Sequence, residues 1–209
     1  MPFDPNQLPA DLPVPTDDGA AAHLPGTAVP AIALPSTAQA STARASTGGA
    51  TMRVDTVPDG FTRLIIYAYP MTGLPGVPVP DGWDEIPGAR GCTPQACGFR
   101  DHAAELGALG AAVAGLSTQG TAYQQEAATR LRLPFPLLSD ADLAVTRALR
   151  LPTFDIELAP AYEGGGRRTL LKRITLVVRD GHVEKVFYPI FPPDQHAAEV
   201  LRWAAATKL

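Results

Sequence analysis

The chain has 209 residues, enough for one domain with a sizeable hydrophobic core. Its 17 basic and 21 acidic residues give a formal net charge of −4, so no basic surface for nucleic acid is expected. No apolar run approaches the roughly 20 residues that span a bilayer, and the first residues lack the basic and apolar regions of a signal peptide. We therefore expect a soluble cytoplasmic protein that binds neither nucleic acid nor membranes.

Residues 1–28 are rich in Pro, Ala, Gly and Asp, and the run Leu12-Pro13-Val14-Pro15 argues against a helix. We predict an extended N-terminal segment over 1–28 and a folded domain over 29–209. Within the domain, Val29–Leu34 is expected as a short strand. The Ser/Thr/Ala/Gly tract over 36–50 is typical of a flexible loop, and Met52–Val57 is expected as a second strand.

The run Thr62–Tyr69 is almost entirely apolar and rich in strand-forming residues, which predicts a strand buried on both faces. A Pro/Gly-rich stretch over 70–91 follows, and it is too long for an ordinary connection. We take the next element, Thr93–Leu109, as an unbroken helix.

The rest of the chain alternates between strands and helices. The Ser139-Asp140 pair is a cap signal for a helix, and Arg179-Asp180-Gly181-His182 is a hairpin turn signature. Asp194 is the candidate N-cap of the last helix. The expected strands are Ala112–Ser117, Phe135–Leu138, Leu170–Val178 and Val183–Phe187, and the expected helices are Thr121–Leu131, Ala141–Leu149 and Asp194–Thr207. This order predicts an α/β fold with a central, partly parallel sheet flanked by helices and closed by an antiparallel hairpin.

The chain contains two cysteines, Cys92 and Cys97, at the start of the helix expected over 93–109. On an intact helix, five residues rise about 7.5 Å and turn about 140°, which separates the two Cα atoms by roughly 8.5 Å. A disulfide needs Cα atoms within about 7 Å. Either the two thiols act independently, or the helix unwinds locally when they join.

Cys92 is the candidate for the reactive thiol. Gly91 precedes it, and Thr93 and Pro94 follow it, as is common where a helix begins. Unpaired backbone N–H groups and the helix dipole favour a thiolate at that place. Cys97 lies further inside the helix and gains less, so we interpret it as the thiol that attacks second.

The two cysteines also allow a structural role and a zinc-binding role. Free cysteines are often small buried hydrophobic residues with no chemical role. A structural zinc site needs about four Cys or His ligands, and the histidines at 23, 102, 182 and 196 show no ligand-pair spacing. The helix-start context of Cys92 favours the redox interpretation.

The run Gly-Cys-Thr-Pro-Gln-Ala-Cys-Gly-Phe-Arg-Asp over 91–101 resembles the active-site helix of peroxiredoxins of the bacterioferritin comigratory protein or peroxiredoxin Q subgroup. Leu116-Ser117-Thr118 and Leu137-Leu138-Ser139-Asp140 are also similar to that subgroup. The resemblance covers the chain from about Val29 onward, and it implies a thioredoxin-like fold.

The resemblance also implies a thiol peroxidase reaction that uses no metal, haem or flavin. Cys92 would attack hydrogen peroxide or an organic hydroperoxide and become a sulfenic acid, and Cys97 would condense with it to a disulfide. Thioredoxin or a similar dithiol would then reduce the disulfide. Because the resolving cysteine is intramolecular, we expect a monomer or a weak homodimer.

Family members also use an arginine from a later strand and a hydroxyl residue before the first cysteine. Arg173 matches the strand context of the arginine, although the alternation along Leu171–Val178 is equally compatible with an exposed strand arginine. The family pattern Pro-x-x-x-Thr-x-x-Cys is not kept, since Glu85 stands at its proline position and Ala89 at its threonine position.

Tyr69-Pro70-Met71-Thr72-Gly73 resembles the beginning of that motif, so we interpret about 73–90 as an insertion within it. Thr72 is then the candidate hydroxyl donor, and an ordinary turn residue is the alternative. Pro70 is a candidate shield for the thiolate. The prolines at 78, 80 and 87 and Trp83 are candidates for a lid over the site, and surface residues with no such role are the alternative.

Three rival hypotheses stay open. A thiol–disulfide oxidoreductase without peroxidase activity usually carries Cys-x-x-Cys, so the four residues between these cysteines count against it. A non-enzymatic redox sensor on the same fold would oxidise similarly but turn over poorly with thioredoxin. An inactive family member is the third, if the altered loop has dismantled the site.

Overall fold

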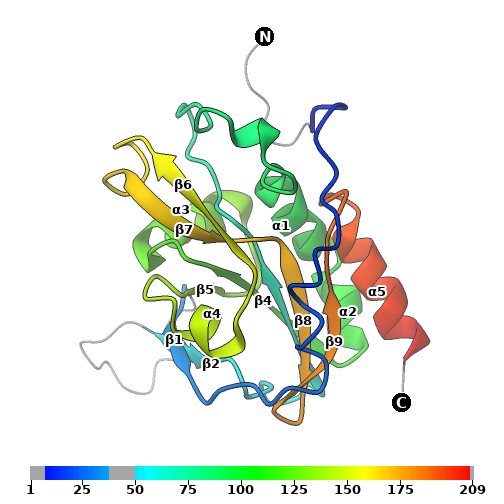
Figure 1. Cartoon of the computed structure of the whole chain (residues 1–209). Coiled ribbons are helices and arrows are strands. Elements are labelled where there is room, and N and C mark those ends of the chain that lie inside the picture. The colour runs from blue at the N-terminus through cyan, green and yellow to red at the C-terminus, as the bar shows by residue number, and fades with distance from the viewer. Residues whose placement is uncertain (1–7, 38–49, 208–209) are drawn as a thin grey trace.

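The computed structural model describes residues 8–37 and 50–207, and its centre is a five-stranded sheet (Figure 1). Strands β3 and β4 and strands β4 and β5 pair in parallel, whereas β8 pairs antiparallel with both β3 and β9. The order across the sheet is β5 (Leu137–Ser139), β4 (Ala111–Ser117), β3 (Arg63–Ala68), β8 (Ile174–Arg179) and β9 (His182–Phe187). The predicted partly parallel sheet with a closing hairpin is confirmed.

Strand β3 is buried along its whole length because both faces of the sheet are covered. Ile65 and Tyr67 point into a core formed with four helices, whereas Leu64 and Ile66 point into a second core on the opposite face. This is the alternation that a strand requires when layers pack on both sides. The four helices are α1 (Cys92–Asp101), α2 (Ala103–Ala108), α3 (Thr121–Leu131) and α5 (His196–Ala206).

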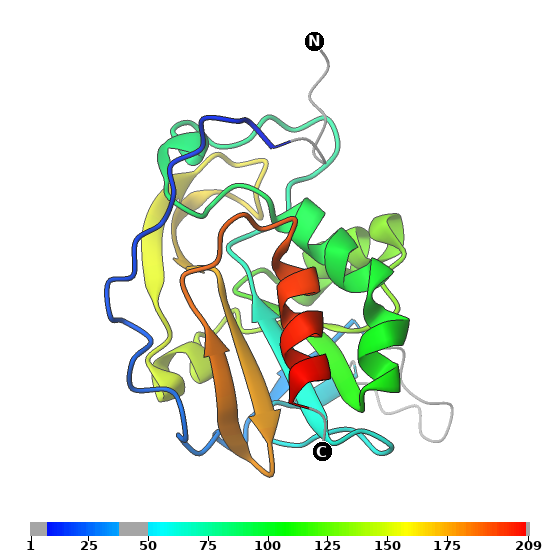
Figure 2. The same cartoon turned by 90° about the vertical axis from the view of Figure 1, so that its right-hand side faces the viewer.

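The second core is closed by smaller elements and by the N-terminal segment. They are α4 (Ala144–Leu149), β1 (Ala33–Pro35) and β2 (Thr51–Arg53), together with Leu24 and Val29. Both β1 and β2 are shorter than the strands predicted over 29–34 and 52–57. The loop predicted over 36–50 lies largely outside the described residues. Figure 2 shows the N-terminal segment running down one side of the molecule.

The helix predicted over 93–109 is wrong as a single element. It begins one residue earlier, at Cys92, and divides at His102 into α1 and α2. The backbone of His102 leaves the helical region at φ −98° and ψ 4°, and the ring of His102 contacts Glu105 Oε1 at 2.8 Å. The cysteine-bearing helix is therefore short, at ten residues.

The strand predicted over 170–178 is also wrong as a single element. It divides into β7 (Gly166–Leu171), which pairs with β6 (Thr153–Leu158), and β8, which pairs with β3. Lys172 and Arg173 lie in the break between the two sheets. Strand β6 was not predicted, although Phe154, Ile156 and Leu158 alternate with polar residues as strand patterns do.

Two predicted helix starts differ from the structure. Helix α4 begins at Ala144 rather than residue 141, yet the Asp140 carboxylate still caps it by accepting bonds from the N–H groups of Val145 and Thr146. Asp194 is not the N-cap of α5. That position is Gln195, whose side chain makes no capping bond.

The long connection over 69–91 and the β6–β7 hairpin form a third, smaller core. Met71 and Trp83 of the connection are buried against Leu158 and Leu170 of the hairpin. Apart from the 3-10 turn η1 (Trp83–Glu85), the connection has no regular structure. No helix among the described residues is long and apolar enough to cross a bilayer.

Candidate active site

Cys92 occupies the first position of α1, where its side chain is buried. Gly91 is the N-cap and has φ 102°, a left-handed conformation that glycine adopts without strain. At this position the helix dipole and the N–H groups of the first turn favour negative charge. The sequence-based placement of Cys92 at a helix start is correct.

Arg173 reaches Cys92 from the break between β7 and β8. Its Nη2 donates to Cys92 Sγ at 3.3 Å and to the carbonyl oxygens of Ala89 and Arg90 at 3.2 and 3.1 Å. Its Nε donates to the carbonyl of Gly88 at 3.3 Å. The planar guanidinium thus binds the thiol and the backbone that leads into it, which a lysine would not reproduce.

Gln95 holds the other side of this guanidinium, and sequence reasoning did not single it out. Its Oε1 accepts a hydrogen bond from Arg173 Nη1, and the residue is fully buried. Its Nε2 has no hydrogen-bond partner within the part of the chain that the structure describes. The signal was available, because Gln95 lies three residues after Cys92 and so on the same face of the helix.

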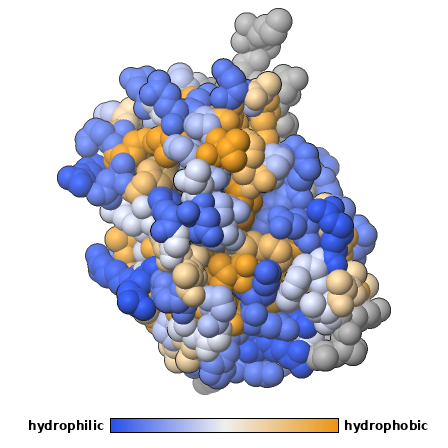
Figure 3. Space-filling model, turned by 45° about the vertical axis from the view of Figure 1, so that its right-hand side comes forward, coloured by the Kyte–Doolittle hydropathy of each residue, from blue (hydrophilic) through white to orange (hydrophobic). Residues whose placement is uncertain are grey.

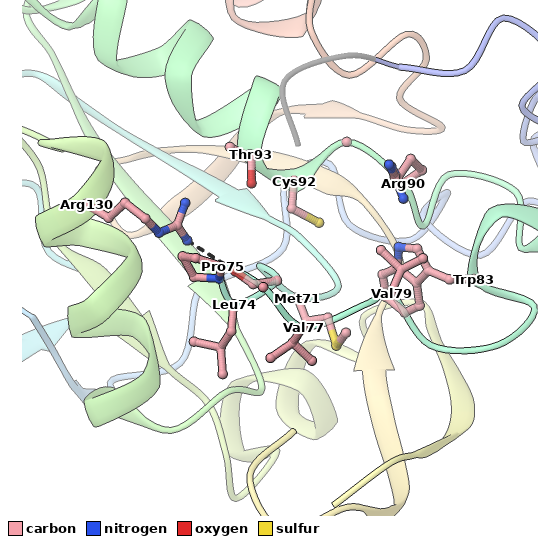
Figure 4. Close-up of a pocket in the computed structure, with 13 residues that line it drawn as sticks. Met71, Leu74, Pro75, Val77, Val79, Trp83, Arg90, Cys92, Thr93 and Arg130 are labelled. Carbon is pink, nitrogen blue, oxygen red and sulfur yellow. Dashed lines mark hydrogen bonds between the residues drawn. The ribbon is translucent and has the colours of Figure 1, made fainter. Parts of the chain in front are cut away.

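A pocket of about 330 Å³ opens over Cys92. Figure 4 shows the sulfur of Cys92 turned into it, with Arg130 on one side and Arg90 on the other. The facing wall is apolar and comes from the long connection; it comprises Met71, Leu74, Pro75, Val77, Val79 and Trp83. Thr93 also lines the pocket, directly beside Cys92.

The two arginines of the pocket are each bound to a carboxylate. Arg90 Nη1 lies 3.1 Å from Asp84 Oδ1, and Arg130 Nε lies 2.7 Å from Glu126 Oε1. Arg130 also donates to the carbonyl oxygen of Gly73 at 3.1 Å, so α3 is fastened to the long connection. These pairs offset much of the positive charge at the rim of the pocket.

Thr72 lies behind the pocket rather than in its lining. Its hydroxyl donates to Gln119 Oε1 at 3.3 Å, and its N–H donates to the same oxygen at 2.9 Å. Its carbonyl oxygen accepts from Gln119 Nε2 and from the hydroxyl of Tyr123. Thr72 therefore fastens the start of the long connection, and Thr93 is the threonine that faces the pocket.

Of the candidate lid residues, Trp83 lines the pocket, whereas Pro87 lines a different cavity, beside the N-terminal residues 14–16. Pro78 contributes its carbonyl oxygen, which accepts a hydrogen bond from Tyr162 of the β6–β7 hairpin. Pro70 is buried and Pro80 precedes η1. The wall over Cys92 is thus built on a packed core and not on a free loop.

Cys97 is a free, half-buried thiol on the same helix and lies outside the pocket lining. Burial raises the pKa of the Cys97 thiol, and the nearby Arg100 guanidinium opposes that shift. Cys92 and Cys97 are not bonded to each other, and the helix between them is intact.

The histidines take separate places. His23 contacts the carbonyl oxygen of Leu149, and His196 is buried beside Thr175. Among the residues that the structure describes, no three His, Cys, Asp or Glu side chains gather as a metal site would require.

Comparisons with known proteins place this arrangement in a family. The redoxin family model matches residues 24–201. A Coxiella burnetii protein provisionally named peroxiredoxin bcp is 29% identical over 139 residues, 66% of this chain and 78% of that protein. The chloroplastic peroxiredoxin Q of Oryza sativa subsp. japonica is 30% identical over 139 residues, but the match spans only 52% of its length.

The fold agrees with these sequence matches. The crystal structure of the peroxidoxin BcpB from Mycobacterium tuberculosis superposes with a TM-score of 0.62 and 26% sequence identity, and it covers 90% of this chain and 100% of that one. Xanthomonas campestris peroxiredoxin Q superposes with a TM-score of 0.61 over 90% of this chain and 98% of its own, at 20% identity. The chain therefore belongs to the redoxin family, as a thioredoxin-fold peroxiredoxin of the bacterioferritin comigratory protein and peroxiredoxin Q type.

Proposed function

We propose that this protein is a thiol peroxidase that reduces hydroperoxides, with Cys92 as the peroxidatic thiol and Cys97 as the resolving thiol. The observation that carries the proposal is the hydrogen bond of 3.3 Å from Arg173 Nη2 to Cys92 Sγ at the base of a pocket. A buried thiol that meets a fixed positive charge and a helix N-terminus is suited to act as a nucleophile.

In the first step the Cys92 thiolate attacks one peroxide oxygen, and the O–O bond breaks. Cys92 becomes a sulfenic acid, and the other oxygen leaves as water or an alcohol after it takes up a proton. Arg173 stabilises the thiolate beforehand and the charge that develops on the leaving oxygen. Gln95 keeps the guanidinium in position, and Thr93 offers a hydroxyl on the same side of the pocket.

In the second step the Cys97 thiolate attacks the sulfenic sulfur of Cys92, and water leaves as the disulfide forms. On intact α1 the Cα atoms are about 8.5 Å apart, too far for a disulfide, so the first turn has to unwind. Thioredoxin or a similar dithiol then exchanges with the disulfide, is itself oxidised, and restores both thiols. We place the protein in a reducing compartment, the cytoplasm, acting as a monomer or weak homodimer.

The apolar wall of the pocket supports organic hydroperoxides as substrates beside hydrogen peroxide. Six apolar residues of the long connection face Cys92, and the rim arginines already have carboxylate partners. The Xanthomonas campestris bacterioferritin comigratory protein, which shares this fold with a TM-score of 0.58, is described as having alkyl peroxide reduction activity. An alkyl tail would bury apolar surface against this wall.

The test compares Cys92→Ser with Cys97→Ser in a peroxidase assay with a thioredoxin system. We expect Cys92→Ser to abolish the reaction with peroxide. We expect Cys97→Ser to consume one equivalent as Cys92 becomes a sulfenic acid, and then to consume further peroxide as that sulfenic acid over-oxidises.

The same assay separates the rivals. A thiol–disulfide oxidoreductase would leave peroxide unconsumed while it reduced disulfides. A redox sensor would oxidise once at Cys92 and fail to turn over with thioredoxin. Retention of peroxide consumption by Cys92→Ser would contradict the assignment of that thiol.

A further inference from the structure

Residues 8–18 cross the loop that leads into Cys92, and they lie outside the stretch that matches the redoxin family. They contain no helix or strand. Figure 2 shows this part of the chain at the end of the molecule that carries the long connection, before the chain turns down along the side. We call residues 8–18 the strap.

The strap lies against Gly88 and Gly91, which are next to or part of the backbone that Arg173 binds. A Cβ atom built on Gly91 would meet Pro193 of the domain first and would lie 3.1 Å from Leu8 Cδ2 of the strap. One built on Gly88 would lie 3.6 Å from Pro15 Cγ. Gly91 is the N-cap of α1, and the carbonyl oxygen of Gly88 accepts from Arg173 Nε. The strap therefore lies over the segment that has to rearrange when α1 unwinds.

Asp18 fastens the end of the strap to the domain. Its Oδ2 lies 2.7 Å from Lys172 Nζ, and its Oδ1 accepts from the hydroxyl of Tyr188 at 2.8 Å. The hydrogen bond from Lys172 lowers the Asp18 pKa to about 2, so the carboxylate is charged at neutral pH. Lys172 directly precedes Arg173 in the break between β7 and β8.

Between its contacts the strap is loosely packed. A cavity of about 350 Å³ lies under Val14, Pro15 and Thr16, against Phe154 and Ile190 of the domain. Val14 is 63% exposed, the most exposed large apolar side chain among the described residues. Figure 3 shows hydrophobic surface, in orange, gathered on the upper part of the face that it displays. A segment held at a few points over a cavity loses little packing when it lifts.

We propose that the strap holds the Cys92 loop in its folded form, that Asp18 is the residue that anchors it, and that its release limits disulfide formation. This inference rests on the proposed peroxidase reaction. Peroxide attack takes place in the folded form, so it does not require the strap to move. Condensation with Cys97 requires the start of α1 to unwind, and the strap contacts at Gly88 and Gly91 then have to be lost.

The strap thereby influences which of two reactions the sulfenic acid of Cys92 undergoes. The sulfenic acid either loses water on attack by Cys97 or reacts with a second hydroperoxide, which gives sulfinic acid and water or an alcohol. A strap that delays unwinding lengthens the life of the sulfenic acid and makes Cys92 more prone to over-oxidation.

The experiment compares the full-length wild type with Asp18→Asn, which removes the charge that pairs with Lys172. Asp17→Asn is the matched control, because Asp17 is a neighbouring carboxylate that accepts a local hydrogen bond from the N–H of Gly19 at 2.9 Å. Asp18→Glu keeps the negative charge and tests whether that charge restores the wild-type rate. Tyr188→Phe removes the second hydrogen-bond partner of Asp18. Rapid mixing with hydrogen peroxide follows Cys92 oxidation and disulfide formation separately, and mass spectrometry measures sulfinic acid.

We expect Asp18→Asn to keep the rate of Cys92 oxidation and to accelerate disulfide formation about two- to fivefold, as loss of one partly exposed ion pair would. Tyr188→Phe should shift in the same direction, Asp17→Asn should match the wild type, and Asp18→Glu should return towards it. Less sulfinic acid should form in the accelerated variants.

The two proposals fail differently. Wild-type Cys92 that does not react with peroxide would overturn the peroxidase assignment. A wild type that reacts, with Asp18→Asn and Tyr188→Phe both forming the disulfide at the wild-type rate, would overturn the strap alone. Slowing of both steps by the same factor in Asp18→Asn would also overturn it, because that result indicates general damage to the site.

Discussion

Arg173 is the side chain on which the geometry of the site depends. It donates to three consecutive carbonyl oxygens, those of residues 88, 89 and 90, as well as to Cys92 Sγ and Gln95 Oε1. One buried cation thus fixes the approach of the chain to the thiol and supplies the charge beside it. The break between β7 and β8 allows its side chain to leave the strand direction and reach this loop.

Replacement of Arg173 by Met should slow oxidation of Cys92 by about 10- to 100-fold, the effect of losing a charged hydrogen bond to the reacting group. Arg173→Lys should recover only part of the loss, because an ammonium group lacks the planar fork. Arg168→Met, on the exposed part of β7, is the control. Competition with a second peroxidase for hydrogen peroxide gives the rate, and an unchanged rate in Arg173→Met would contradict the assigned role.

The pKa of Cys97 predicts how the second step depends on pH. Burial raises the pKa of this thiol, so at neutral pH little of it is thiolate, and disulfide formation should accelerate as the pH rises. Arg100 lowers the Cys97 pKa and Asp101 raises it. Arg100→Met should therefore slow the step at neutral pH, and Asp101→Asn should speed it. Stopped-flow measurement between pH 6 and 9 checks this, and equal profiles in both variants would refute it.

At this scale the sequence indicated where residues with a local signal lie, and their catalytic roles stay predictions. Cys92 and Cys97 stand in a recognisable helix start, and Arg173 follows from the family resemblance. Gln95 was missed because its role depends on a side chain 78 positions away. Thr72 was expected at the peroxide, and the structure turns its hydroxyl towards Gln119 instead; only the folded position of α3 and its preceding loop decides that.

The β6–β7 hairpin and the long connection form one unit at the scale of elements. Trp83 and Phe154 lie with ring centroids 6.2 Å apart, and the Tyr162 hydroxyl donates to the carbonyl of Pro78. Neither element packs a core alone, so each depends on the other for its buried surface. The hairpin thereby supports the apolar wall of the pocket without touching Cys92.

Val77 is half-buried in that wall and offers a test of its role. Val77→Ser should lower kcat/KM for cumene hydroperoxide about tenfold, because burial of an apolar tail against valine is lost. The value for hydrogen peroxide should stay within about twofold, since that substrate has no tail to bury. Steady-state assays with both substrates decide, and an equal loss for both would show that the change disturbs the site itself.

The sequence predicted helices and turns correctly where the residues of one continuous segment determine them. Helix α3 was predicted with its observed bounds, and the Asp180-Gly181 turn joins β8 to β9 with positive φ at both residues. The segment over 170–178 was misjudged because Leu171 pairs with Thr153 whereas Ile174 pairs with Ala68. A continuous apolar pattern does not reveal that its two halves belong to different sheets.

The molecule as a whole is a sheet between two cores, and a buried histidine lies in the core on the side of α1 and α5. His196 is buried against Phe99 and Phe187, and its Nε2 lies 2.9 Å from Thr175 Oγ1. Burial, together with the charge of Arg173, lowers the His196 pKa to about 3. The folded protein therefore keeps this ring neutral under conditions in which an unfolded chain would protonate it.

This difference predicts a loss of stability in acid. Below about pH 6.5, His196 binds a proton in the unfolded chain, whereas in the folded chain it stays neutral down to about pH 3. The free energy of unfolding should therefore fall as the pH drops. The slope from this residue approaches about 1.4 kcal/mol per pH unit. His196→Gln should flatten the dependence, and His182→Gln, at an exposed site, should retain it. Urea denaturation at pH 5 and pH 7 provides the comparison, and equal slopes in all three proteins would contradict it.

The β8–β9 turn lies at the end of the molecule opposite the start of α1 (Figure 1). Asp180 is exposed there, and the strands that join it to the site are hydrogen-bonded within the sheet. A fluorophore attached at this turn, through a cysteine introduced at position 180 while Cys92 and Cys97 are protected only for the labelling step, would sit on hydrogen-bonded strands at the far end of the molecule from α1. Paired with a second dye on the strap, it would serve as the stationary reference against which each catalytic cycle is timed in single molecules.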